Sequence, residues 1–166
     1  MAKTSNSVFI LLGGNLLDVK RTFEMAIAEI SKKAGQVSLQ SPLYKSAAWG
    51  FESDDDFLNQ VIEIKTELPA TKLLSVLLDI EQYLGRTRNP NTNRFSSRII
   101  DIDILYFNTD VIKLAHLTIP HYAIQDRLFT LIPLCDLIPE FLHPVLKKTN
   151  SQLLASCNDK NIPVRI

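Results

Sequence analysis

The stretch that decides the fold is SSRIIDIDILYF, residues 96–107, an apolar run with aspartates at positions 101 and 103. Its β-branched residues, at almost every other position, predict a buried strand. Because strand side chains alternate between faces, Asp101 and Asp103 point the same way, about 6.6 Å apart. At that distance two carboxylates repel by about 2–3 kcal/mol at an effective dielectric of 20. Arginine ion pairs, an open end of the sheet or a bound divalent cation would each compensate this repulsion.

If side chains alternate strictly along this strand, each of its residues can be assigned to one face of the sheet. Ile100, Ile102, Ile104 and Tyr106 are expected on one face. Leu105 and Phe107 are expected on the other face, with the two aspartates.

The preceding segments alternate between strand and helix patterns. Strands are expected at residues 7–14, 36–49, 57–68 and 98–107, with an irregularity at Pro42. One helix is expected between Asp18 and Gly35, and a second between Pro69 and Gly85. This order predicts an α+β fold with a ferredoxin-like βαββαβ core, a mostly antiparallel sheet with helices packed on it. The C-terminal additions are expected to hold a short strand or loop and two short helices.

Composition limits the possible class of protein. With 166 residues, of which 46% are hydrophobic and 22% charged, the chain is predicted to form a single globular domain, residues 1–166. A net charge of zero removes the global electrostatic case for nucleic acid or an anionic membrane as partner. No apolar run approaches the roughly 20 residues of a membrane span, and the N-terminus lacks a signal-peptide pattern. Cys135 and Cys157 are expected to be reduced thiols, which favours a cytoplasmic location.

Basic residues cluster just before the aspartate-bearing strand. Arg86, Arg88, Arg94 and Arg98 fall within 13 positions. The planar guanidinium suits phosphate oxygens, and paired carboxylates suit Mg²⁺, so the two motifs together indicate nucleotide phosphate chemistry. The glycine-rich phosphate loop with its lysine is missing, which excludes a P-loop enzyme. A solvated basic loop, an RNA-binding sheet, a Mg²⁺-dependent phosphohydrolase or nuclease and an inactive nucleotide sensor are the alternatives.

Four segments, in this order along the chain, resemble the 6-hydroxymethyl-7,8-dihydropterin pyrophosphokinase family of folate biosynthesis. They are LLGGNLLD, SPLYKSAAWGF with DFLNQVIEIKTEL, LLDIEQYLGRTR with NRFSSRIIDIDILYF, and LTIPHYAIQDRLFTLIPLCDLIPEFLHP. The resemblance implies transfer of a pyrophosphoryl group from ATP to the hydroxymethyl oxygen of the dihydropterin, with release of AMP. It implies ATP and the pterin as small-molecule partners, two Mg²⁺ ions held by Asp101 and Asp103, and a monomer or weak homodimer. Neither nucleic acid nor a membrane is expected as a partner, because of the zero net charge and the lack of a long apolar run.

The resemblance also assigns roles to individual residues. The catalytic residues would be Arg86, Arg98, Asp101 and Asp103. The ATP-binding residues would be Glu81, Arg88, Arg98, Thr118, His121, Tyr122 and Arg127. The pterin-binding residues would be Ser46, Ala47, Trp49, Phe57, Asn59, Phe95, Asp101 and Phe129. We also expect residues 47–56 and 85–98 to close over the bound ligands.

The sequence departs from the family pattern at several positions. Gly14 stands where a serine is usual, and Ser46-Ala47-Ala48 where Thr-Pro is common. Phe95 stands where some members carry tryptophan, so an aromatic stacking partner is kept and its N–H is lost. Because none of these positions is a metal ligand or an arginine, we expect them to affect substrate affinity rather than the reaction.

Overall fold

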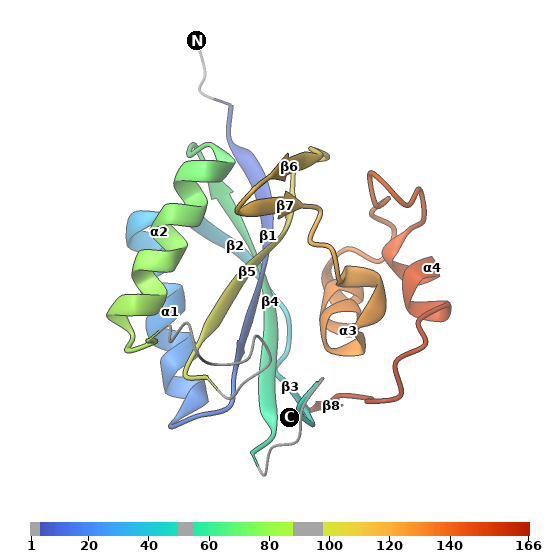
Figure 1. The fold of residues 1–166 in the computed structure, drawn as a ribbon, viewed down its shortest axis with the longest axis horizontal. Coiled ribbons are helices and arrows are strands. Elements are labelled where there is room, and N and C mark those ends of the chain that lie inside the picture. Colours follow the sequence, from blue (N-terminus) through green and yellow to red (C-terminus); the bar gives the residue numbers. More distant parts are fainter. Residues whose placement is uncertain (1–3, 50–54, 88–97) are drawn as a thin grey trace.

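The computed structural model describes residues 4–49, 55–87 and 98–166. A central sheet is covered by α1 and α2 on one side and by α3 and α4 on the other (Figure 1). The strands are β1 Asn6–Gly14, β2 Gln36–Gln40, β3 Tyr44–Ser46, β4 Phe57–Thr66, β5 Asp101–Phe107, β6 Ile112–Leu114, β7 Leu117–Ile119 and β8 Val164–Arg165. The α-helices are α1 Val19–Lys33, α2 Ala70–Tyr83, α3 Leu128–Leu137 and α4 Asn150–Ala155, and a 3-10 turn, η1, spans Ile124–Asp126. In the described part of the chain, no helix has the length and hydropathy of a membrane span.

The sheet has the strand order β5-β1-β4-β3-β8, and β2 also pairs with β4. The central strand β1 is antiparallel to both β4 and β5. This is the order of a ferredoxin-like core, so the predicted α+β fold is confirmed. The second predicted strand is split into β2 and β3 around Pro42, which has no N–H for the ladder. Ser41 bridges the break, because its Oγ accepts a hydrogen bond from Val61 N at 3.0 Å.

Each face of the sheet carries its own apolar core. On one face α1 and α2 bury residues at helical spacing against the strands, among them Phe23, Ile30, Leu73, Leu77 and Ile80. On the other face Phe9, Leu11 and Val61 pack against Leu131 and Leu134 of α3. Each such fully buried side chain contributes about 1.5–3 kcal/mol relative to its exposed state. The site described below lies on the α3 face.

The predicted alternation along β5 holds only as far as Ile104. Ile104 pairs with Ile10, but Tyr106 pairs with Phe9, so the strand contains one extra residue, Leu105, as a β-bulge. The faces are exchanged beyond it, because Tyr106 joins the core under α3 and Phe107 joins the core under α1 and α2. The predicted faces of Tyr106 and Phe107 are therefore wrong. The two aspartates precede the bulge and keep their common face.

The C-terminal additions form a second layer and one more strand. The β6–β7 hairpin is followed by a cis Ile119-Pro120 bond, η1, α3 and α4. The two predicted short helices correspond to α3 and α4. The last residues return to the sheet as β8, which pairs antiparallel with β3. This edge strand has only two residues, both exposed, and was not expected from the sequence.

Candidate active site

A row of directly paired residues crosses the sheet on its α3 face. Gly13 of β1 pairs with Asn59 of β4 on one side and with Asp101 of β5 on the other. Directly paired residues of antiparallel strands share a face. Because Gly13 has no side chain, Asn59 and Asp101 flank bare backbone, where an added Cβ would lie 3.5 Å from Asn59 Oδ1. Asp103 follows on the same face, paired with Leu11.

Asp101 lies between two arginines. Arg86 Nη1 donates to Asp101 Oδ1 at 2.7 Å, and Arg98 Nη1 donates to Oδ2 at 2.9 Å. Burial on its own would raise the pKa of Asp101, but the charges of Arg98 and Arg86 lower that pKa below its ordinary value. Asp101 is therefore an ionised carboxylate at neutral pH. Arginine ion pairs were one of the three expected ways to offset the repulsion between the two aspartates, and Asp101 uses this one.

Glu81 supports Arg86 from inside the protein. This residue of the last turn of α2 is 2% exposed, and its Oε2 lies 3.0 Å from Arg86 Nη1. Its Oε1 accepts a hydrogen bond from Ile102 N at 2.7 Å. Burial would lower the pKa of Arg86, but the charges of Asp101 and Glu81 raise it above its ordinary value. Glu81 thus ties α2, Arg86 and β5 together.

Asp103 has a different environment from Asp101. Burial raises the pKa of Asp103 well above its ordinary value, and the charges of Asp101 and Glu81 raise it further. Its Oδ2 lies 4.0 Å from His121 Nε2. His121 Nδ1 accepts a hydrogen bond from Ala123 N at 3.2 Å, so the neutral imidazole carries its proton on Nε2, the nitrogen nearer Asp103. A cation bound here would lower the cost of ionising Asp103.

An arginine lies between two aromatic rings at the start of α3. Arg127 Cζ lies 4.6 Å from the ring centroid of Trp49 and 5.5 Å from that of Phe129. Arg127 immediately precedes α3 and Phe129 belongs to its first turn. Cation–π contacts of this kind contribute about 0.5–2 kcal/mol each. The structure therefore places a predicted ATP-binding residue between two predicted pterin-binding residues.

The predicted pterin side includes a buried amide. Asn59 and Ser46 are 3% and 4% exposed, and Asn59 Nδ2 donates to Ser46 Oγ at 3.0 Å. Phe57 pairs with Ser46 across β3 and β4, so these side chains share the α3 face. Ala47 follows and is exposed. The hydroxyl of Ser46 thus holds the amide of Asn59, whose Oδ1 lies next to Gly13.

The remaining predicted residues lie at the edge of this group or outside the described ranges. Tyr122 is 47% exposed and stacks on His121, with ring centroids 4.6 Å apart. Thr118 is exposed on β7. Arg88, Arg94 and Phe95 lie outside the described residues, as do most of the two segments expected to close.

One residue of the site was not predicted. Asn15 Oδ1 accepts a hydrogen bond from Arg98 N at 2.9 Å, and Asn15 N donates to Arg98 O at 3.0 Å. Asn15 therefore fixes the backbone that presents Arg98 to Asp101. Its position, directly after the two glycines that end β1, is the sequence signal that could have identified it.

The donor set fits Mg²⁺. Among the residues that the structure describes, no group of three or more His, Cys, Asp or Glu side chains could hold a metal ion. Mg²⁺ needs only one or two protein carboxylates, because water and substrate phosphates fill its other positions. Asp101 and Asp103 supply two carboxylates, and the arginines beside them suit the phosphates.

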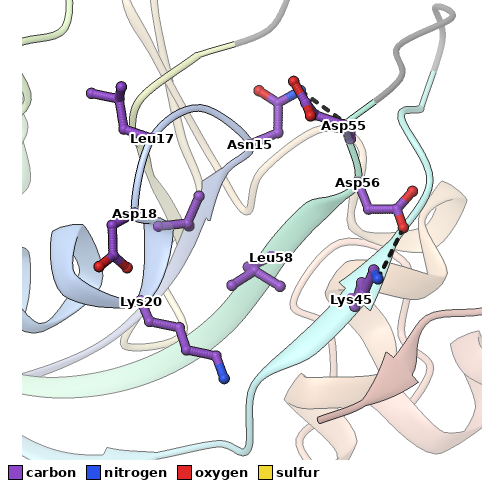
Figure 2. Close-up of a pocket in the computed structure, with 9 residues that line it drawn as sticks. Asn15, Leu17, Asp18, Lys20, Lys45, Asp55, Asp56 and Leu58 are labelled. Atoms are coloured by element: carbon purple, nitrogen blue, oxygen red, sulfur yellow. Dashed lines mark hydrogen bonds and ion pairs between the residues drawn. The ribbon is translucent and has the colours of Figure 1, made fainter.

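A pocket of about 450 Å³ opens on the α1 side of the sheet and shares Asn15 with the site (Figure 2). Its lining residues are Asn15, Leu17, Asp18, Val19, Lys20, Lys45, Asp55, Asp56 and Leu58. The side chain of Leu58 packs on the α1–α2 core, and Lys45 Nζ lies 3.4 Å from Asp56 Oδ2. None of the predicted site residues is among these lining residues. The charged cluster on the α3 face, rather than this pocket, is therefore the candidate active site.

Solved structures confirm the fold. A crystal structure of wild-type HPPK-DHPS from Plasmodium falciparum matches with a TM-score of 0.73 at 19% sequence identity. The match covers 93% of this chain and 45% of that chain. At this identity, the likeness concerns the fold alone.

Sequence comparisons identify the family. The chain is 37% identical over 134 residues to 2-amino-4-hydroxy-6-hydroxymethyldihydropteridine pyrophosphokinase of Bacillus subtilis, covering 80% of this chain and 78% of that protein. It is 35% identical over 144 residues to the protein of the same name from Synechocystis, covering 86% and 72%. It also matches the folic acid synthesis protein FOL1 of Dictyostelium discoideum at 33% identity, over 96% of this chain but only 24% of that longer protein. The family model for 7,8-dihydro-6-hydroxymethylpterin-pyrophosphokinase matches residues 9–139, more than half of the sequence. The chain therefore belongs to the 7,8-dihydro-6-hydroxymethylpterin-pyrophosphokinase family.

Proposed function

We propose that this chain transfers the terminal diphosphate of ATP to the hydroxymethyl oxygen of 6-hydroxymethyl-7,8-dihydropterin in folate biosynthesis. The hydroxyl oxygen attacks the β-phosphorus, the bond between that phosphorus and the α,β-bridging oxygen breaks, and AMP leaves. The hydroxyl proton is lost as the new P–O bond forms. The observation that carries the proposal is one face of the sheet, where Asp101 and Asp103 lie beside Arg86, Arg98 and the amide of Asn59.

The arginines have two sets of partners in this reaction. Without ligand, Arg86 and Arg98 bind the carboxylate of Asp101. In the complex, their guanidinium groups bind ATP phosphates, while Asp101 and Asp103 would hold two Mg²⁺ ions whose charge stabilises the phosphate oxygens. Glu81 keeps Arg86 oriented through this exchange. Because phosphoryl transfer needs little covalent help from protein, positioning and charge stabilisation supply most of the rate.

The two substrates meet where Arg127 contacts the rings of Trp49 and Phe129. Asn59 hydrogen-bonds the edge of the pterin ring, and Phe129 stacks on the face of that ring. Arg127 binds the ATP phosphates. Further ATP-side contacts come from Arg88, Thr118, His121 and Tyr122. Further pterin-side contacts come from Ser46, Ala47, Trp49, Phe57 and Phe95.

Residues 1–166 form one domain, the enzyme acts in the cytoplasm, and it is a monomer or weak homodimer. The segments 47–56 and 85–98 close when both ligands bind, which amide hydrogen exchange with and without ligands measures. Unchanged exchange there with both ligands bound would contradict the closure.

A product assay tests the reaction. The wild type is incubated with ATP, Mg²⁺ and 6-hydroxymethyl-7,8-dihydropterin, and the products are identified by mass spectrometry. We expect AMP and a pterin heavier by one diphosphate in equal amounts. Asp103→Asn should lower kcat by at least about 100-fold, the scale of removing one charge-stabilising group. Asp110→Asn, which makes the same change at an exposed aspartate three residues after β5, should not change it.

Other products would exclude the proposal. ADP and phosphate without a pterin product would indicate a phosphohydrolase that uses the same aspartates. Intact ATP, despite nucleotide binding, would indicate an inactive nucleotide sensor.

A further inference from the structure

The C-terminal tail, residues 156–166, connects the two walls of the candidate pterin site. It leaves α4, runs past α3 and ends as β8 beside β3 (Figure 1). The family model ends its match at residue 139, so the tail lies outside the segment that defines the family. Its contacts are made to the start of α3 and to residue 47, both of which belong to the predicted site.

The first contact is an N-terminal cap supplied from the tail. The residue before α3, Arg127, makes no side-chain capping bond. Instead, Asp159 Oδ2 accepts a hydrogen bond from Leu128 N at 3.0 Å. A carboxylate at a helix N-terminus satisfies a free N–H and interacts favourably with the helix dipole. Asp159 therefore fixes the turn of chain that carries Arg127 and Phe129.

The second contact reaches the opposite wall. Asn161 Nδ2 donates to Ala47 O at 2.8 Å. The two contacts are coupled, because Asn161 N donates to Asp159 Oδ1 at 2.9 Å. Three tail residues thus span from the start of α3 to the segment that contains Ala47 and Trp49.

The end of the tail is also anchored. Val164 and Arg165 pair with Lys45 and Tyr44 of β3, and Ile166 N donates to Leu43 O at 3.1 Å. The tail is therefore held to β3 after Asn161 and to α3 before it. Because the tail is fixed at both ends, it can hold the start of α3 and residues 47–49 at a defined distance from each other.

We propose that Asp159 and Asn161 are positioning residues for substrate binding, which set the spacing between the start of α3 and residues 47–49. Asn161 acts on the pterin wall, whereas Asp159 acts on the turn that carries both Phe129 and Arg127. Loss of the Asn161 bond should therefore weaken pterin binding more than ATP binding, because Arg127 reaches this wall only through Trp49. Loss of the Asp159 cap should weaken the binding of both substrates. This inference rests on the proposed function, because it takes the walls to bind pterin and ATP.

Asn161→Asp keeps the side-chain shape and removes the donor to Ala47 O. The matched control is Asn158→Asp, which adds the same charge at an exposed position of the same tail. Calorimetry would measure pterin binding in the presence of Mg²⁺ and α,β-methylene-ATP. It would also measure binding of this analogue with Mg²⁺ and without pterin. We expect Asn161→Asp to weaken pterin binding about five-fold, which corresponds to about 1 kcal/mol for one hydrogen bond. Binding of the analogue should change by less than about two-fold, and Asn158→Asp should change neither.

Asp159 provides the second arm. Asp159→Ala should weaken pterin and analogue binding by about three-fold to ten-fold each, and Asp159→Asn, which keeps one acceptor oxygen, should recover part of both. Equal pterin affinities in Asn161→Asp and Asn158→Asp would overturn the inference. So would equal losses of both ligands in Asn161→Asp, since a general loosening of the fold would produce them. A wild type that binds no pterin would instead remove the proposed function.

Discussion

The two aspartates of β5 are alike in sequence and differ in charge environment. Asp101 has two arginines within hydrogen-bonding distance, which hold its pKa below the ordinary value. Asp103 faces His121, and burial beside other carboxylates holds its pKa above the ordinary value. Arginine ion pairs therefore compensate the negative charge of Asp101, whereas the charge of Asp103 would be compensated by a bound cation. This asymmetry supports the proposal that the two aspartates act in catalysis rather than in folding.

Gly14 is required by close approach of the backbone. A Cβ at this position would lie 2.5 Å from Ile99 O, whereas a Cβ at Gly13 would make only an ordinary contact of 3.5 Å. The serine usual in the family should therefore be harmful here. We expect Gly14→Ser to lower the stability by about 2 kcal/mol, through displacement of residues 98 and 99. The thermal midpoint should fall by about 4–8 °C in calorimetry.

Gly13→Ala is the matched control for this prediction. It should leave the thermal midpoint within about 2 °C of the wild type. It should weaken pterin binding, because its methyl group lies between Asn59 and Asp101. A wild-type midpoint in Gly14→Ser would show that the Ile99 backbone moves aside at little cost.

Among the helices and strands, those whose pattern lies within one continuous segment could be predicted from the sequence. The periodicities that predicted α1, α2, β1, β4 and β5 lie within single segments, so the residues themselves carry the signal. The bulge at Leu105 and the strand β8 depend on partners far along the chain, such as Lys45 for Val164. No local pattern marks such pairings.

The same division applies to the candidate site. Residues such as Asp101 and Arg86 could be assigned from the sequence, because they stand in motifs whose roles in the family are known. Asn15, Asp159 and Asn161 act through backbone groups of distant segments. Their partners are set by the fold and not by side-chain identity, so the sequence alone did not reveal them.

Glu63 of β4 connects three strands of the sheet. Its Oε1 accepts a hydrogen bond from Ser7 Oγ of β1, and its Oε2 from Ser38 Oγ of β2, both at 2.6 Å. Burial would raise the pKa of Glu63, but bonds from Lys65, Ser38 and Ser7 lower it below its ordinary value of 4.5. A lowered pKa stabilises the folded state above that value, and the stabilisation is lost as pH falls below it.

We therefore expect Glu63→Gln to destabilise the protein at pH 7 by about 1.5 kcal/mol, the scale of a hydrogen bond to a charged group. The difference from the wild type should shrink below pH 4.5. Urea unfolding of both proteins at pH 7 and near pH 3 measures it. Glu24→Gln, on the exposed side of α1, should have no effect at either pH. A difference that does not vary with pH would assign the role to side-chain packing.

At the scale of the whole molecule, the two layers have different tasks. The α1–α2 layer supplies Glu81 and otherwise buries apolar side chains, while the α3 side carries most of the predicted site residues. By formal count, the charged residues of the site that the structure describes are also balanced. They are three arginines, Arg86, Arg98 and Arg127, and three carboxylates, Glu81, Asp101 and Asp103. The formal charge of the chain is likewise zero, so the molecule as a whole has no net positive charge that would attract a triphosphate.

ATP binding should therefore require a divalent cation. The arginines can leave Asp101 for the phosphates only if another positive charge replaces them there, since an unpaired carboxylate that is mostly shielded from water is costly. With Mg²⁺ and α,β-methylene-ATP at about 100 times its Kd, the protein should gain about 2.7 kcal/mol, or about 5–10 °C in thermal midpoint. With EDTA in place of Mg²⁺, the same analogue should produce almost no shift, and EDTA alone should leave the midpoint unchanged. Asp103→Asn should lose most of the shift even with Mg²⁺ present. An equal shift in EDTA would mean that the arginines suffice for the triphosphate, and the two aspartates would then need another role.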